Sequence, residues 1–234
     1  MDLSALETRF RTLSGDHGVP ALWPTEEVTG FLNAAEREAA ERARLLHDKT
    51  NPAVTQIPLV IGQRNYRLHP KVLDVLAISL QRPGVTDLRR WEVHRTTDED
   101  MRHAHNRKPT ITGWPCRFHV YGQPDGAGTA GMHLQLDRAP DIDGGILHLE
   151  VDRYPLLDMI DPDDEPEIAP RDHDALVHWA LWVAYSTRDM EGSASERALR
   201  HLGIFEARFG ERDDANVRRK KVRHRAPVVR QARF

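Results

Sequence analysis

The stretch from Ile57 to Leu80 constrains the fold of this chain more than any other part of it. It opens with an apolar, β-branched run, after which Tyr66 and Leu68 alternate with polar neighbours. Alternation with a period of two is typical of a half-buried strand. Pro70 removes a backbone donor and biases the residue before it towards an extended conformation, so the chain should turn there. Because a second apolar run, Val72 to Leu80, follows at once, the stretch predicts a strand, a tight corner and another strand.

Two amphipathic helices are expected before this stretch. Apolar residues spaced three to four apart from Leu3 to Leu13 predict a short helix that stops at Gly15. A longer apolar stripe predicts a second helix from about Thr25 to Asp48, with Thr25 as a candidate N-cap. Asn51-Pro52 is expected to end this second helix.

The middle of the chain, Ile57 to Tyr154, has the patterns of antiparallel β structure. Thr97 and the acids after it predict a short capped helix between two strands. Glycine-rich or Asp-Gly segments at Gly122 to Gly131 and at Asp141 to Gly145 predict turns between strands. The further strands are expected at Val85 to Trp91, Arg117 to Tyr121, Met132 to Asp137 and Ile146 to Val151.

The end of the chain returns to helical patterns after an acidic boundary. Asp158 to Glu167 holds six acids and two prolines, which predicts an exposed linker. A largely apolar helix is expected from about Arg171 to Met190. Another helix should begin at the capping-box pattern Ser193-Ala194-Ser195-Glu196 and end at Gly210.

Together these elements predict an α+β fold. Each flanking helix has an apolar stripe that cannot stay in water, so the N- and C-terminal helices should pack into a bundle. An antiparallel β domain is then inserted between them, and an extended tail follows. The expected divisions are residues 1–52 (N-terminal helices), 53–157 (inserted β region), 158–211 (C-terminal helices packing on the N-terminal ones) and 212–234 (basic extended tail).

The composition narrows the class of protein. Hydrophobic residues make up 39% of the chain and charged residues 29%, as in soluble globular proteins. No apolar run approaches the ~20 residues that span a membrane. The N-terminus lacks the basic-then-apolar layout of a signal peptide, and a lone cysteine, Cys116, excludes an intrachain disulfide. A cytosolic origin is the default expectation.

No recognised catalytic or metal-binding motif is present. His103 and His105, with His94 nearby, lack further ligands in any known spacing. The acidic run Asp161 to Glu165 lacks the alternating oxygen ligands of a calcium loop. We therefore predict that the protein is not an enzyme and that it has no catalytic residue, no metal and no cofactor. A hydrolase that uses two carboxylates stays open as an alternative, because nothing in the sequence selects such a pair.

The basic C-terminal tail is the sharpest functional signal. From Ala215 to Phe234 there are eight Lys or Arg and no acid, so the rest of the chain carries about −11 against a net charge of −3 overall. An acidic body with a basic tail suggests that the tail has a partner of its own. The candidate partner-binding residues are Arg218, Arg219, Lys220, Lys221, Arg223, Arg225, Val228, Val229, Arg230, Arg233 and Phe234.

Three interpretations of this tail are open. It could be a solubilising end, a sequence-independent DNA-binding segment that contacts phosphates, or a segment that orders in an acidic groove of a partner protein. The apolar residues among the basic ones favour the protein groove, because phosphate binding gains little from them. Val228-Val229 could also add to the edge of a sheet.

An ordered series of short motifs resembles a known family. One motif is Tyr66-Arg67-Leu68-His69-Pro70, which is similar to that family's Tyr-x-Leu-Pro corner except that His69 stands between the Leu and the Pro. Another is Gly113-Trp114-Pro115, which is similar to its Gly-x-Pro. The family is that of the head–tail adaptor (head completion or connector) proteins of tailed bacteriophages, in the style of podovirus tail-accessory adaptors. The other similarities within Leu22 to Gly210 are Trp23 to Val28 with the helix after it, Val72 to Leu80, Arg117 to Tyr121, Leu134 to Leu136, Leu147 to Tyr154 and the helices from Ile168.

This resemblance implies a structural virion protein. It implies a ring, usually of twelve copies, that lies beneath the portal protein in the neck of the virion and continues the channel for double-stranded DNA. Tail tube or nozzle proteins would attach below, C-terminal segments would grip the portal, and no membrane is involved. Assembly would take place in the host cytoplasm. An acidic body suits a channel wall along which DNA slides, because phosphates are repelled. The alternatives are a DNA-binding protein that acts through its tail and a tail-associated cell-wall hydrolase.

Overall fold

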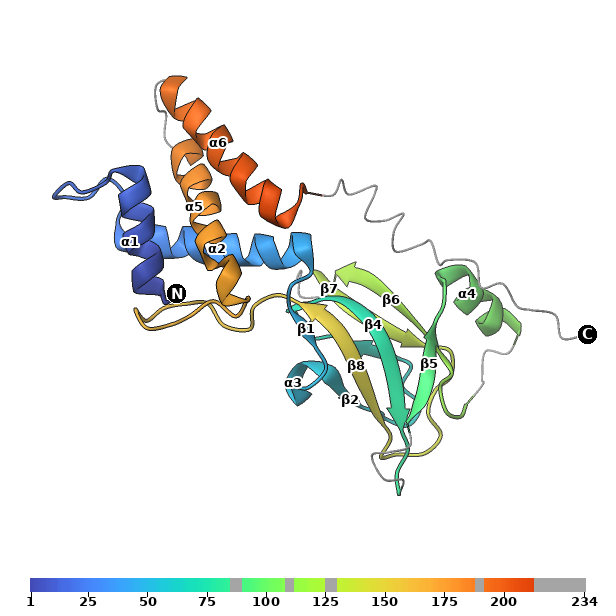
Figure 1. Cartoon of the computed structure of the whole chain (residues 1–234). Helices are drawn as coiled ribbons and strands as arrows, with labels where there is room; N and C mark the ends of the chain where they lie inside the picture. The colour runs from blue at the N-terminus through green and yellow to red at the C-terminus, as the bar shows by residue number, and fades with distance from the viewer. Residues whose placement is uncertain (85–89, 108–111, 125–129, 188–191, 213–234) are drawn as a thin grey trace, which may run out of the picture.

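Helices from both ends of the chain pack together, and the strands between them form a curled sheet beside this helical layer (Figure 1). The computed structural model describes residues 1–84, 90–107, 112–124, 130–187 and 192–212. The arrangement confirms the predicted α+β fold with a β part inserted between helical ends. The division into four domains stays a prediction.

The helical layer is built around α5 (His173–Thr187). It follows a short 3-10 helix, η1 (Pro170–Asp172), and packs against α1 (Leu3–Ser14), α2 (Thr25–Ala43) and α6 (Gly192–Phe209). Contact with three helices explains why α5 is apolar around much of its circumference. Large buried side chains of the layer are Leu6, Phe10, Trp23, Leu32 and Leu181 in one cluster and Ile168, Leu176, Trp179, Phe205 and Phe209 in another.

Local signals set several helix ends, and two of these signals, Gly15 and Thr97, were predicted. The Asp2 side chain accepts a hydrogen bond from the Ala5 N–H at 2.8 Å at the start of α1, and Gly15 ends that helix with a φ of 74°. Glycine takes this left-handed conformation without steric cost. Thr97 accepts from the Asp100 N–H at 3.2 Å, which confirms the cap before α4 (Asp98–Arg107).

The prediction for α2 was right about its start at Thr25 but wrong about its capping residue and its end. Pro24 occupies the N-cap position without a side-chain hydrogen bond, and the Thr25 hydroxyl instead accepts from Arg11 at 3.1 Å. The helix ends at Ala43, five residues early, because Arg44 turns left-handed with a φ of 50°. The chain then enters strand β1 (His47–Asp48), whose pairing with residues more than 100 positions away no local pattern predicts.

The sheet contains β1, β2 (Gln56–Pro58), β3 (Asn65–Arg67), β4 (Val72–Gln81), β5 (Trp91–Arg95), β6 (Arg117–Pro124), β7 (Ala130–Leu136) and β8 (Ile146–Arg153). Its order is β1-β8-β4-β5-β6-β7-β3, and β2 also pairs with β8. The sheet curls around an apolar core that includes Ile78, Leu80, Phe118, Leu134, Leu136, Leu147 and Leu149.

Three features of the sheet differ from the predictions. β5 and β6 run parallel, because the chain between them passes through α4 and returns in the same direction. β5 begins at Trp91, the last residue of the strand expected at Val85 to Trp91, and continues to Arg95; residues 85–89 of that expectation lie outside the described part. The strand expected from Ile57 is the short β2, which α3 (Pro52–Thr55) precedes. Asn51 caps α3 through a hydrogen bond from the Ala53 N–H at 3.1 Å.

Candidate functional site

The predicted partner-binding residues, Arg218 to Phe234, lie outside the described residues. The point from which the tail departs is described, however. Gly210 ends α6 with a φ of 84°, and its carbonyl accepts a hydrogen bond from Arg42 at 3.0 Å. The Arg42 guanidinium lies 5.0 Å from the Trp179 ring centroid and 5.3 Å from that of Phe205. This contact fixes the root of the tail against α2 and α5.

A second candidate surface is the segment from β8 to η1, residues 156–169, which we call the strap. The sequence predicts an exposed linker here, and most of its residues are exposed. It is nevertheless tied down, because Met159 is buried and both its backbone groups bond to Asn33, each at 2.9 Å. Strap carbonyls also accept from the free N–H groups that begin α1: Leu3 bonds to Asp164 at 2.8 Å and Ser4 to Pro162 at 3.0 Å.

The buried Asn33 side chain is expected to contribute to the stability of the folded protein. Replacing it with Ala removes both hydrogen bonds to Met159 and leaves two buried backbone groups unpaired. We expect a loss of about 2 kcal/mol in the free energy of unfolding, measured by urea denaturation. The exposed Asn65 is the matched control, and Asn65→Ala should change stability by less than ~0.5 kcal/mol. Equal effects of the two substitutions would show that Asn33 does not anchor the strap.

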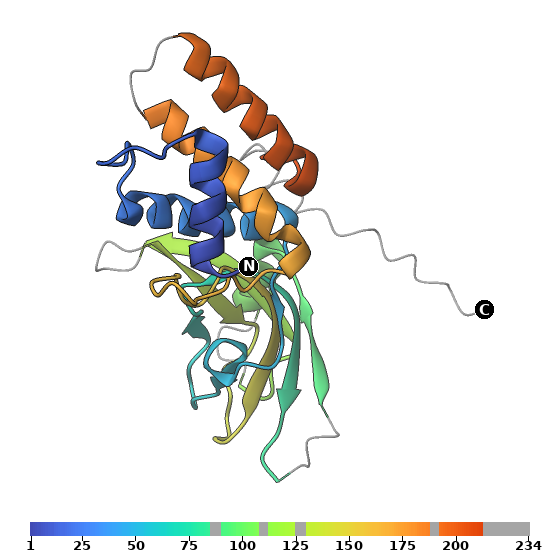
Figure 2. The same ribbon diagram turned by 60° about the vertical axis from the view of Figure 1, so that its left-hand side comes forward.

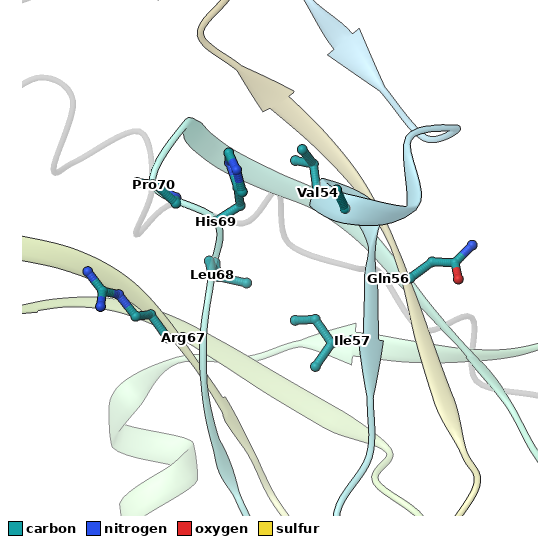
Figure 3. A pocket seen from close by; sticks show the side chains of 8 residues that line it. Val54, Gln56, Ile57, Arg67, Leu68, His69 and Pro70 are labelled. Atoms are coloured by element: carbon teal, nitrogen blue, oxygen red, sulfur yellow. The ribbon is translucent and has the colours of Figure 1, made fainter. Parts of the chain in front are cut away.

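An open cavity of about 440 Å³ lies between the two ends of the curled sheet. Ile57 from β2 and Leu68 after β3 point into the gap, whereas Gln56 and Arg67 point to opposite outer sides (Figure 3). The lining residues are Ala53, Val54, Gln56, Ile57, Arg67, Leu68, His69 and Pro70. No carboxylate side chain is among them, so this cavity lacks the two carboxylates that the hydrolase alternative requires.

Comparison with known proteins decides the family. The family model described as SU10 adaptor protein matches residues 1–231. The chain belongs to the SU10 adaptor protein family. The role of this adaptor is therefore structural, in a phage virion, and membership points to a protein without enzymatic activity. This confirms the predicted resemblance at the level of a phage adaptor, while its head–tail position stays a prediction.

Other comparisons add little to the family assignment. No curated protein matches this adaptor. Among solved structures, a chain of the type VI secretion system TssK-TssF-TssG baseplate subcomplex, determined by cryo-electron microscopy, is similar at 15% sequence identity over 73% of the adaptor, with a TM-score of 0.24. The adaptor spans about a third (35%) of that chain, and the similarity is too low for an argument.

Among the described residues, the carboxyl group with the largest pKa shift is that of Glu36, which is hydrogen-bonded to backbone N–H groups. Burial raises the pKa of Glu36 to about 7, and the nearby carboxylates of Glu167 and Asp158 act in the same direction. Its Oε1 accepts from the Glu167 N–H at 2.6 Å, and the Ile168 N–H bonds to it as well. These bonds engage Glu36 with the strap backbone, away from the cavity. Its raised pKa therefore gives no support to the hydrolase alternative.

Two partly buried histidines join α5 to α6 in the adaptor. The Nδ1 atoms of His178 and His201 lie 2.9 Å apart, and the rings stack. Burial, together with His178 and Arg200, lowers the pKa of His201 to about 4, and burial also lowers the pKa of His178, so this pair links two neutral rings at neutral pH. The pair is therefore a direct contact between α5 and α6.

The adaptor residues that the structure describes contain no group of three or more His, Cys, Asp or Glu side chains that could hold a metal ion. None of the helices in those ranges is both long and apolar enough to cross a bilayer. The candidate functional surfaces described so far are the root of the tail and the strap.

Proposed function

We propose that this chain is a head–tail adaptor. Copies of it form a ring of twelve beneath the portal in the virion neck, extend the DNA channel and provide the surface to which tail tube or nozzle proteins attach. The observation that carries the proposal is the match of the SU10 adaptor family to residues 1–231. The ring would form from subunits made in the host cytoplasm.

The charge distribution supports a channel-forming role. Without the eight basic residues of the tail, the chain carries 25 basic and 36 acidic residues. An acidic wall repels phosphates and lets double-stranded DNA slide past. The same excess of acids gives the body little reason to bind DNA by itself.

The tail is the proposed contact with the portal. It starts from a point that Arg42 fixes, and the 22 residues after Arg212 span up to about 75 Å when extended. Its basic side chains, Arg218 to Arg233, suit an acidic groove, and Val228, Val229 and Phe234 would add apolar contacts within it.

A shortened chain tests the portal contact. The full chain and a variant that ends at Arg212 would be mixed with purified portal and followed by native mass spectrometry. We expect the shortened variant to bind at least tenfold more weakly. Its thermal unfolding should be unchanged, because the contact between Arg42 and Gly210 is kept. Equal binding by both chains would contradict tail docking.

A matched substitution separates charge from apolar contact. Replacing Val228, Val229 and Phe234 together with Ser keeps the length and charge of the tail. Docking in a protein groove predicts that this variant binds the portal more weakly than the natural chain. Purely electrostatic attraction predicts that the two bind equally well. A control with Ser at Ala226 and Ala232 should bind like the natural chain.

DNA binding through the tail is the second candidate, which the eight basic residues without an acid favour. It predicts a gel shift of duplex DNA that requires the tail and weakens steeply as salt is added. Absence of any tail-dependent shift at low salt would remove this candidate. A tail-dependent shift without portal binding would put it first.

A further inference from the structure

The strap holds two large apolar side chains in water. Leu157 is 80% exposed and Ile160 is 79% exposed, although the backbone between them is fixed at Met159. Asp158 is also paired with Arg37 of α2. Side chains that a rigid backbone presents to solvent in this way suit a contact with another protein.

The exposed side of α2 continues this apolar surface. Gly30 and Ala34 lie one helical turn apart and are exposed, next to the positions of Asn33 and Arg37 that hold the strap. A Cβ on Gly30 would meet nothing within 4 Å, so packing within the chain does not require this glycine. Glycine inside a helix is unfavourable relative to alanine. We call Gly30, Ala34, Leu157 and Ile160 the strap–α2 face.

A second surface of the same kind lies on α6. Leu199 is 64% exposed and Ile204 is 40% exposed, on the side of α6 that turns away from α5. Gly203 lies between them, is exposed, and has nothing within 4 Å of its missing Cβ. We call Leu199, Gly203, Ile204 and the exposed Ala207 the α6 outer face.

The charges around the two faces are complementary. The acids Glu26, Glu27, Asp161 and Asp163 are exposed beside the strap–α2 face. The α6 outer face carries exposed Arg197 and Arg200, with Glu196 as its acid. Opposite charges at the rim of an apolar contact fix its orientation and oppose contacts between two like faces.

The two faces lie on different sides of the helical layer, with the strap below α1 and α2 and with α6 at the far end (Figures 1 and 2). We propose that these faces bind each other between copies of this chain, the α6 outer face of one copy against the strap–α2 face of the next. Contact between two different faces is head-to-tail, and it closes into a ring when the rotation between copies permits. This inference rests on the ring of the proposed function and assigns the contacts between its subunits. The two glycines would let the facing surfaces approach closely.

Two charge substitutions test the two faces separately. Leu199→Glu alters the α6 outer face, and Ile160→Lys alters the strap–α2 face, each at an exposed side chain. Self-association of each variant, measured by sedimentation against concentration, should be at least tenfold weaker than that of the natural chain. Val19→Glu is the control, because Val19 is fully exposed in the loop between α1 and α2. Association that is unchanged in both face variants would overturn the proposal.

Mixing the two variants gives the sharper test. Leu199→Glu keeps a sound strap–α2 face and Ile160→Lys keeps a sound α6 outer face, so the mixture should form a mixed dimer although neither variant associates alone. Native mass spectrometry distinguishes the two subunits by mass. Failure to form this mixed dimer, under conditions in which the natural chain associates, would show that these faces do not meet.

The portal provides the readout if the natural chain is monomeric alone. Copies that contact their neighbours should load onto the portal cooperatively, and each face variant should load non-cooperatively. Equal cooperativity in the natural chain and both variants would reject the assigned faces. If the natural chain itself does not bind the portal, the proposed function is rejected. Failure of the proposed function is therefore distinguishable from failure of the assigned faces.

Discussion

Replacing Arg153 with Ala is expected to destabilise the protein by about 3 kcal/mol. The Arg153 side chain is 13% exposed and bonds to Asp48 at 2.8 Å, to Glu167 at 2.6 Å and to the Tyr154 carbonyl at 3.0 Å. Its removal leaves the Asp48 carboxylate, which is 7% exposed, without its cation. The loss is large because a buried charge without its partner costs more than the intact pair contributes.

Asp48 indicates how strongly the site favours the ion pair. Burial opposes its ionisation, but the N–H groups of Asn51 and Thr50 and the Arg153 guanidinium outweigh burial and hold the pKa of Asp48 below its usual value. Arg153 also joins three parts of the chain, because Asp48 belongs to β1, Arg153 to β8 and Glu167 to the strap. The substitution should therefore loosen the sheet and the strap together.

Urea denaturation measures the effect, with Arg9→Ala as the matched control. Arg9 bonds to Asp174 at 3.0 Å, but both side chains are largely exposed, so its loss should cost less than ~1 kcal/mol. If the two substitutions lower the free energy of unfolding equally, Arg153 is not a buried link. The double variant Asp48→Asn with Arg153→Ala should recover part of the loss, because no buried charge then remains.

The regular elements could be predicted from the sequence because their signals are local. Alternation in Leu147 to Val151 gave β8, and the stripe from Leu3 to Leu13 gave α1. The parts that were missed depend on distant residues. β1 exists through its pairing with β8, and the parallel pairing of β5 and β6 depends on how the chain returns after α4.

The contact between the strap and α2 was not predicted, although polar residues on the apolar side of α2 indicate a hydrogen-bonding partner there. Asn33 and Glu36 lie on the apolar side of α2, where a stripe of apolar residues is expected, and both are buried. Polar groups in such positions need hydrogen-bond partners, and the strap backbone provides them. Leu157 and Ile160 are likewise apolar residues in or beside an acidic segment. Nothing local in the sequence states that these two regions meet.

Replacing Glu36 with Gln is expected to remove a pH-dependent contribution of about 3 kcal/mol to the free energy of unfolding. Glutamate ionises near pH 4.5 in the unfolded chain, whereas burial raises the pKa of Glu36 to about 7 in the folded one. Between these values the folded protein binds the additional proton. The free energy of unfolding contributed by Glu36 therefore falls as pH rises from about 4.5 to about 7, by about 3 kcal/mol in total.

Glutamine is neutral at every pH, so the variant lacks this fall. Its Oε1 can still accept the hydrogen bond from the Glu167 N–H, as a protonated glutamic acid does. The stability of the variant relative to the natural protein should thus rise by about 3 kcal/mol between pH 4.5 and pH 8. Urea denaturation at several pH values measures this difference, and Glu165→Gln on the exposed part of the strap controls for the loss of one negative charge.

Other titrating groups act on both proteins and cancel in the difference. The pKa of His201 is lowered to about 4 by burial and by its neighbours His178 and Arg200, so its contribution is lost as pH falls below about 6.5, opposite in sign to that of Glu36. The natural protein should consequently show a flatter profile between pH 4.5 and 6.5 than the variant, which keeps only the histidine effect. The pKa values of Asp16 and Asp48 are lowered, and their contributions are lost only below about pH 4. A difference between variant and natural protein that is the same at pH 5 and pH 8 would show that Glu36 does not bind its proton near neutral pH, and that the strap is held over an ionised carboxylate throughout.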